Sequence, residues 1–131
     1  MTAMLRDRRA VLALVVLVVA AVAGVLVSRL TARGDVREIE LTARSMAFYA
    51  PGSGANPTLA VRPGERVRIV VRNETPGMVH DLAIDAFGVS TPLLNAGETG
   101  ALEFTAPREA GRHEYVCRPH SVMMRGVIEV R

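Results

Sequence analysis

The sequence predicts an all-β domain, a sandwich or barrel of short strands, preceded by one apolar N-terminal helix. Between about residues 36 and 131, short runs alternate apolar and polar side chains, which is the pattern of strands with one buried face. Dipeptides such as Pro63-Gly64 and Pro76-Gly77 separate these runs and are typical of turns. Residues 10–27 differ, because they form one unbroken stretch without a charged or polar side chain.

The apolar stretch predicts a membrane anchor. It contains 18 residues, and a helix of that length extends about 27 Å, close to the thickness of a bilayer hydrocarbon core. We therefore expect a short cytoplasmic N-terminus at residues 1–9, an uncleaved transmembrane signal-anchor at residues 10–27, a linker at residues 28–35 and an exported domain at residues 36–131.

A cleaved signal peptide is the alternative interpretation. Residues 21–23 have the small side chains of a signal-peptidase site, but cleavage there would leave the apolar residues 25–27 near the new N-terminus. Three arginines lie within residues 6–9, which favours an N-terminus inside the cell. The expected location is the cell membrane, crossed once, with the C-terminal domain on the extracytoplasmic, periplasmic side.

Strands can be expected where the alternation is clear. In the strand predicted at residues 66–72, Val67, Ile69 and Val71 share one face, and arginines occupy the other. Such a strand buries its apolar face and exposes its charges. Further strands are predicted at residues 36–41, 101–104 and 127–130.

The composition limits the kind of protein this can be. A length of 131 residues suits one domain. The single cysteine excludes an internal disulfide framework and every zinc site that needs two or more thiolates. The formal net charge is +3, with +4 in residues 1–33 and −1 in residues 34–131. Because the basic excess accompanies the apolar stretch, we expect no nucleic-acid partner.

The chemically informative residues are one cysteine, two histidines and one methionine. Cys117, His120 and Met124 occur in one expected loop after a strand, and His80 precedes another expected strand. One thiolate, two imidazoles and one thioether suit a single copper ion, because soft sulfur ligands stabilise Cu(I) and imidazole binds both oxidation states. The sequence therefore predicts one copper ion, cycling between Cu(II) and Cu(I), at these four side chains.

The same loop resembles that of a known family. Its pattern Cys117-x-x-His-x-x-x-Met-Arg-Gly is similar to the single-cysteine loop of the cupredoxins, the small blue-copper proteins such as azurin, plastocyanin and amicyanin. The segment 73–80 fits the upstream part of the family pattern, and the resemblance extends over about residues 36–131. It implies a cupredoxin-like Greek-key β-sandwich, with His80, Cys117 and His120 as equatorial ligands and a methionine as the axial ligand.

Two details of the site stay open in the sequence. Met124 fits the longer His-to-Met spacing and is the preferred axial ligand, whereas Met123 fits the shorter spacing of amicyanin-like loops. Asp81 stands where many cupredoxins have an asparagine that ties the ligand loops together. An acidic group there is expected to lower the reduction potential or alter that connection. His113 lies four residues before Cys117, about 13 Å away along a strand, and is expected to be a core or edge residue.

The expected function is that of a one-electron carrier and not an enzyme. A dinuclear copper centre needs two cysteines on the loop, and a multicopper oxidase needs more than the three histidines present. A Cys–His hydrolase would need an oriented base and an oxyanion hole, which nothing else in the sequence suggests. The alternative function is a copper chaperone, storage or resistance protein that binds copper without carrying electrons.

The expected partners are the membrane, through the N-terminal helix, and an envelope redox protein or a copper-trafficking protein. The electron is expected to pass through His120. An apolar docking rim around it is expected from Pro76, Met78, Val122 and Met123. Arg118 and Arg125 beside this rim would favour an acidic patch on the partner.

Overall fold

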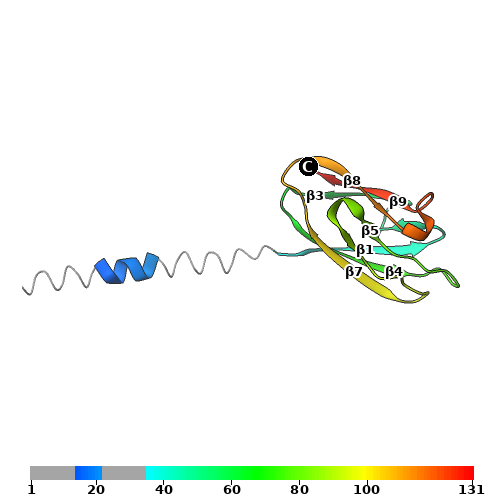
Figure 1. Cartoon of the computed structure of the whole chain (residues 1–131), viewed down its shortest axis with the longest axis horizontal. Helices are drawn as coiled ribbons and strands as arrows, with labels where there is room; N and C mark the ends of the chain where they lie inside the picture. The colour runs from blue at the N-terminus through cyan, green and yellow to red at the C-terminus, as the bar shows by residue number, and fades with distance from the viewer. Residues whose placement is uncertain (1–13, 22–34) are drawn as a thin grey trace, which may run out of the picture. The chain divides into compact units, whose positions relative to one another are not determined.

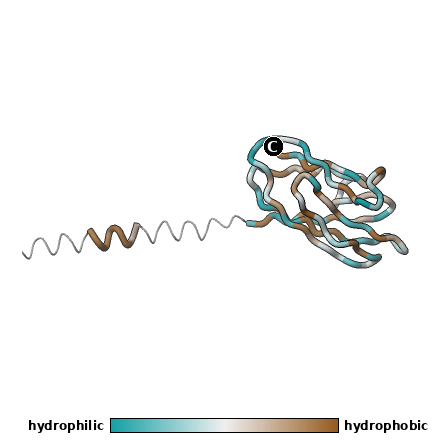
Figure 2. The backbone as a smooth tube through the Cα atoms, viewed as in Figure 1, coloured by the Kyte–Doolittle hydropathy of each residue, from teal (hydrophilic) through white to brown (hydrophobic). Residues whose placement is uncertain are grey.

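The computed structural model describes residues 14–21 and 35–131. Residues 14–21 are helical and exposed, and Figure 2 shows them as uniformly hydrophobic. The remainder of the expected membrane anchor and the expected cytoplasmic N-terminus lie outside the described residues, as does all but the last residue of the linker. Within the two described ranges, no helix is both long enough and apolar enough to cross a bilayer.

Asp35–Arg131 form one compact unit in which two β-sheets make the two layers of a sandwich (Figure 1). The strands of the first sheet are β1 (Arg37–Arg44), β2 (Ala47–Tyr49), β4 (Arg66–Asn73) and β7 (Thr99–Thr105). The strands of the second sheet are β3 (Thr58–Val61), β5 (Ala83–Ile84), β6 (Val89–Ser90), β8 (Gly111–Val116) and β9 (Arg125–Val130). The strand orders are β2-β1-β4-β7 and β3-β9-β8-β5-β6.

The connections between strands place one loop at an end of the sandwich. β1 is parallel to β4, and β3 is parallel to β9, so each of these pairs needs a crossover. β8 and β9 are antiparallel neighbours, with Val116 opposite Arg125. The chain therefore leaves β8 and re-enters β9 through residues 117–124, which contain the short 3₁₀ helix η2 (Arg118–His120).

The predicted alternation of β4 is confirmed. Val67, Ile69 and Val71 are buried, and the arginines of the opposite face are exposed. Each fully buried side chain of this kind contributes roughly 1.5–3 kcal/mol to folding. The strands predicted at residues 101–104 and 127–130 lie within β7 and β9. Apolar residues from both sheets form one core, so the all-β sandwich is confirmed and the barrel alternative is not.

The short strands β2, β3, β5 and β6 are absent from the sequence prediction. They contain only two to four residues each, which is too few for an alternation to be recognised. β5 matters for the site because Ala83 pairs with Val116 of β8. This pairing brings the segment that follows His80 beside the residue that precedes Cys117.

The other 3₁₀ helix, η1 (Asp85–Phe87), follows β5 directly and is capped at its C-terminal end by Gly88. Gly88 adopts a left-handed conformation with φ 66°, which glycine accepts without steric cost. His113 of β8 is half-buried and packs its ring 4.8 Å from the Phe87 ring. The expectation that His113 is a core or edge residue is in agreement with this position.

Candidate metal centre

Three potential metal ligands converge at the end of the sandwich where β8 ends. His80 Nδ1 and His120 Nδ1 each lie 3.5 Å from the Cys117 sulfur, and one donor atom from each of the three residues lies within 4.8 Å of the others. Cys117 and His80 are fully buried, and His120 is partly exposed. The structure thus brings three of the four predicted ligands within reach of a single ion.

His80 is held by a backbone bridge and by its ring. Its N–H donates to the Leu94 carbonyl at 3.1 Å, and the Leu94 N–H donates to the His80 carbonyl at 2.8 Å. The ring Nε2 lies 3.1 Å from Thr75 Oγ1, and this hydroxyl donates its own hydrogen to the Ala43 carbonyl at 3.3 Å. The hydroxyl therefore accepts from Nε2–H, which leaves the Nδ1 lone pair directed toward Cys117 and available to a metal.

A buried amide fixes the loop that leads to His80. Asn73 is completely buried, and its Nδ2 donates to the Met78 carbonyl at 2.8 Å and the Leu94 carbonyl at 2.9 Å. Its Oδ1 accepts from the Thr75 N–H at 2.8 Å. Because each buried group left without a partner costs about 1–3 kcal/mol, this amide stabilises the whole segment around His80.

The loop 117–124 is closed by its own backbone. The Cys117 N–H donates to the Met124 carbonyl at 2.9 Å, the His120 N–H donates to the Cys117 carbonyl at 3.1 Å, and the Met124 N–H donates to the His120 carbonyl at 2.9 Å. Pro119 lies in the first turn of η2, where its fixed φ suits the helical backbone. These bonds set the spacing of Cys117, His120 and Met124 locally.

Burial separates the two candidate axial ligands. Met124 is fully buried and belongs to the same core cluster as Cys117. Met123 is 59% exposed, so its side chain lies on the outside of the loop. This difference supports the preference for Met124 that its spacing from His120 predicts.

Asp81 connects the two ligand-bearing segments. It is buried, and its Oδ1 accepts from the Arg118 N–H at 2.7 Å. The Arg118 guanidinium lies 3.9 Å from the other oxygen of Asp81 and 2.7 Å from Asp85 Oδ1. A carboxylate oxygen accepts the same N–H that an asparagine oxygen would accept. The connection between the loops is therefore kept, and the difference that Asp81 makes is its charge.

Burial also determines the protonation of the ligands. Burial, and to a smaller extent the nearby His120, lower the pKa of His80, although Asp81 opposes this. Burial raises the pKa of the Cys117 thiol. A neutral imidazole is ready to bind a metal, whereas a thiol must first lose its proton. Metal binding at this site should therefore release a proton from Cys117.

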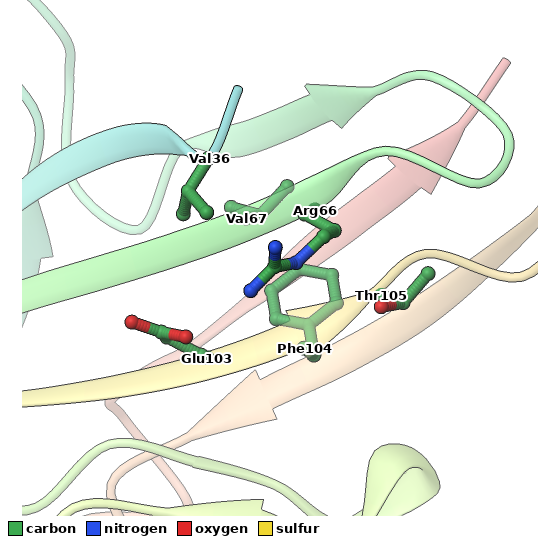
Figure 3. Close-up of a pocket in the computed structure, with 6 residues that line it drawn as sticks. All are labelled: Val36, Arg66, Val67, Glu103, Phe104 and Thr105. Atoms are coloured by element: carbon green, nitrogen blue, oxygen red, sulfur yellow. The ribbon is translucent and has the colours of Figure 1, made fainter. Parts of the chain in front are cut away.

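The candidate site consists of buried His80 and Cys117 and partly exposed His120. One cleft in residues 35–131 lies on the first sheet and is lined by Val36, Arg66, Val67, Glu103, Phe104 and Thr105 (Figure 3). These side chains include no thiol, thioether or imidazole. A single ion needs only converging donor atoms, which the buried cluster around Cys117 supplies.

Two residues beside the site are missed by the sequence prediction. Thr75 bonds the His80 ring, and Asn56 donates from Nδ2 to the Met123 carbonyl at 2.9 Å. A threonine in a turn and an asparagine before a proline are ordinary loop residues, and no local pattern shows what they contact. Only the packing of distant segments brings them to the metal-binding loops.

The comparison with family models gives one match. Residues 38–131 match the model described as copper binding proteins, plastocyanin/azurin family. This covers nearly all of the sandwich, including the four predicted ligands. No curated protein matches the chain.

Several solved structures share this fold. Auracyanin from the photosynthetic bacterium Roseiflexus castenholzii is similar with a TM-score of 0.60 and 18% identity, over 75% of this chain and 99% of that chain. Auracyanin A, a "blue" copper protein from Chloroflexus aurantiacus, has a TM-score of 0.59 and 22% identity, over 74% and 100% of the two chains. Rusticyanin from Thiobacillus ferrooxidans has a TM-score of 0.59 and 24% identity, over 75% and 79%. These likenesses show that the fold is shared.

Proposed function

Because this chain belongs to the plastocyanin/azurin family of copper-binding proteins, we propose that it is a one-electron carrier. His80, Cys117, His120 and Met124 are arranged as a type 1 copper site. In the proposal, these four residues would hold one copper ion, with Met124 and not Met123 as the methionine ligand. Copper, when bound, supplies the Cu(II)/Cu(I) couple.

The observation that carries this proposal is that hydrogen bonds of the protein itself hold the ligands in place. Thr75 and the Leu94 bridge hold His80, and the backbone bonds of loop 117–124 hold the other ligands. Ligands held by their own supporting contacts move little when the charge of the metal changes. A small change in geometry favours rapid electron transfer over tight storage of one oxidation state.

An apolar rim around His120 supports docking of a redox partner. Among residues 35–131, the large apolar side chains that remain exposed lie mostly in the loops next to the ligands. These rim residues are Met78, Val79, Leu93, Val122 and Met123. Met78, Val122 and Met123 are three of the four rim residues expected from the sequence. The fourth, Pro76, is also exposed. Exposed apolar residues of this kind are typical of an interaction site, and the partly exposed His120 is the proposed exit for the electron.

The arginines next to the rim have acidic neighbours. Arg118 pairs with Asp85 and lies near Asp81, and Arg125 lies 3.3 Å from Glu114. Because these acidic groups offset the two guanidinium groups, we propose that apolar contact contributes more to docking than attraction to an acidic patch. The association rate should then depend only weakly on ionic strength.

The central test is copper binding by the purified chain. We expect one equivalent of Cu(II) to produce strong visible thiolate-to-copper absorption and a reversible one-electron wave in voltammetry. Cys117→Ser should abolish the absorption completely, because an alcohol does not provide a thiolate ligand. The matched control is Ser121→Ala, which changes the same loop without removing a donor to the ion. A Cys117→Ser protein with unchanged copper absorption would contradict the proposal.

The alternative function, a copper chaperone or store, is supported by the same donor set. It makes different predictions: Cu(I) would pass to a copper-free acceptor protein, and electron exchange with a redox partner would be slow. The partial exposure of His120 is compatible with either function. Measuring both transfers with one protein preparation separates the two, because a carrier exchanges electrons many times while keeping its metal.

We also propose that residues 10–27 anchor the chain in the cell membrane, with the copper domain on the extracytoplasmic side. The support is the length and apolar character of that segment. After cell fractionation, the full-length chain should remain in the membrane pellet through an alkaline wash, and protease added outside the inner membrane should digest residues 35–131. Release into the soluble fraction would favour a cleaved signal peptide.

A further inference from the structure

We propose that Asn56 is a positioning residue that holds the Met123–Met124 peptide and so determines where the Met124 thioether lies relative to the other ligands. This inference rests on the copper site proposed above. Asn56 lies in the loop between β2 and β3, 67 positions before Met123, and its Nδ2 donates to the Met123 carbonyl at 2.9 Å. It thus reaches the ligand loop from a distant part of the chain.

The bond from Asn56 completes the restraint on one peptide plane. The Met123 carbonyl and the Met124 N–H belong to the same rigid peptide unit. The N–H donates to the His120 carbonyl at 2.9 Å, and the carbonyl accepts from Asn56. Because both polar groups of this peptide plane are bonded, the backbone at Met124 has little freedom to rotate. The direction of the Met124 Cα–Cβ bond is therefore fixed.

Asn56 is itself tied to the core. Its N–H donates to the Phe48 carbonyl at 2.7 Å, and its Oδ1 accepts from the Phe48 N–H at 3.0 Å. Its φ of 50° is left-handed, a conformation that asparagine tolerates better than most residues. Because Oδ1 faces an N–H and Nδ2 faces a carbonyl, the orientation of the amide is consistent on both sides. Asn56 therefore links a fully buried strand residue to the ligand loop.

The neighbouring residue reinforces this link. The hydroxyl of Tyr115 donates to the Pro57 carbonyl at 2.6 Å, and the Tyr115 ring packs edge-on against the Phe48 ring, with centroids 5.6 Å apart. A Cβ at Gly126 would overlap the Tyr115 ring, so the chain just after Met124 lies directly on that ring. The segment 56–57 is thus held between Phe48 and Tyr115, next to the ligand loop.

The restraint matters because the axial ligand cannot position itself. The bond between copper and an axial methionine is long and weak, and the reduction potential depends on it. The protein must therefore set the distance of the thioether from the ion. Asn56 acts on the peptide next to Met124, whereas the backbone bond between Cys117 and Met124 acts on the other side of the same residue.

The test compares two Asn56 variants with a control in the same loop, all in the full chain. Asn56→Asp keeps an oxygen that accepts from Phe48 but places a second oxygen against the Met123 carbonyl. Asn56→Gly keeps the left-handed backbone and removes both side-chain bonds. The control is Ser53→Ala, since Ser53 Oγ bonds to Ala50 and Gly54 within its own loop. Each protein is loaded with Cu(II) alone.

We expect both Asn56 variants to shift the reduction potential and the intensity ratio of the thiolate-to-copper bands, and to lose copper about tenfold faster. In the copper-free proteins, amide exchange at Met124 should accelerate. Ser53→Ala should leave all four measurements at the wild-type values. Thermal unfolding of the copper-free proteins reports any general loss of stability, and if one Asn56 variant does not fold, the other decides the test.

Two results are distinguishable. If a folded Asn56 variant keeps the wild-type potential and band ratio, the positioning role is overturned, even when its thermal stability is lower. If the wild-type chain itself shows no strong thiolate-to-copper absorption, the proposed function fails instead, and the amide exchange at Met124 in the copper-free proteins still decides whether Asn56 holds the loop.

Discussion

The two segments that carry the proposed ligands are built in different ways. His80 is part of the core: it is completely buried, bridged to Leu94, and bonded through its ring to Thr75. The loop 117–124 reaches the surface, where His120 is partly exposed and Val122 is 89% exposed. One segment thus provides a buried, hydrogen-bonded ligand, and the other provides a ligand that a partner can approach.

The hydrogen bonds that hold the two segments also differ. Around His80, the polar groups of buried Asn73 are all bonded to nearby backbone. The loop 117–124 is supported by its own short bonds and by two residues from elsewhere, Asp81 and Asn56. An exposed loop needs such external bonds, because fewer apolar contacts hold it. The comparison shows how one site combines a rigid ligand with an accessible one.

The largest expected effect comes from removing each imidazole in turn. In His120→Gly, added imidazole should restore the visible copper absorption, because the space left by His120 opens to the surface. In His80→Gly it should restore little, because that position is fully buried and deletion also leaves Thr75 without its ring partner. Absorption titrations with imidazole measure both. Equal restoration in the two variants would mean that the burial difference does not control access.

The next effect is the pH dependence of copper affinity. Burial raises the pKa of the Cys117 thiol, so the thiol is protonated at neutral pH and copper binding releases that proton. Burial lowers the pKa of His80, so this imidazole is already neutral and releases none. Affinity should therefore rise about tenfold per pH unit through neutral pH, until the pH reaches the raised pKa of the thiol. Competition with a chelator at several pH values measures the slope, and a flat profile would contradict this assignment.

The smallest effect concerns the charge of Asp81. Asp81→Asn keeps an oxygen that can accept the Arg118 N–H, but it removes a negative charge that stabilises the more positive, oxidised site. Because Arg118 offsets part of that charge, we expect the oxidised site to lose about 1 kcal/mol of stabilisation. This loss raises the reduction potential by roughly 40 mV for one electron. Voltammetry measures the change.

The control for Asp81 is Asp85→Asn, since Asp85 pairs with the same arginine but is exposed. It should shift the potential less, because solvent screens its charge. If Asp81→Asn leaves the potential unchanged while loosening the copper, then Asp81 serves only to connect the two ligand segments.

Local patterns predicted much of this protein. The alternation in β4 predicted which of its side chains are buried, because burial of one face requires a period of two residues. Cys117, His120 and Met124 could be assigned to one site because they lie within eight positions of a single loop. Strands as short as β5 and β6 could not be predicted, since two residues show no period.

By itself, the sequence determined the class of the fold, the donor set and its preference for copper, because these depend on side-chain chemistry and on spacing within one segment. Only the tertiary structure decided that His80 lies 3.5 Å from Cys117, through the pairing of Ala83 with Val116. It also decided that Met124 is inside and Met123 outside, and that Asn56 and Thr75 support the site. Contacts between distant segments depend on how the two sheets pack, and no local spacing records them.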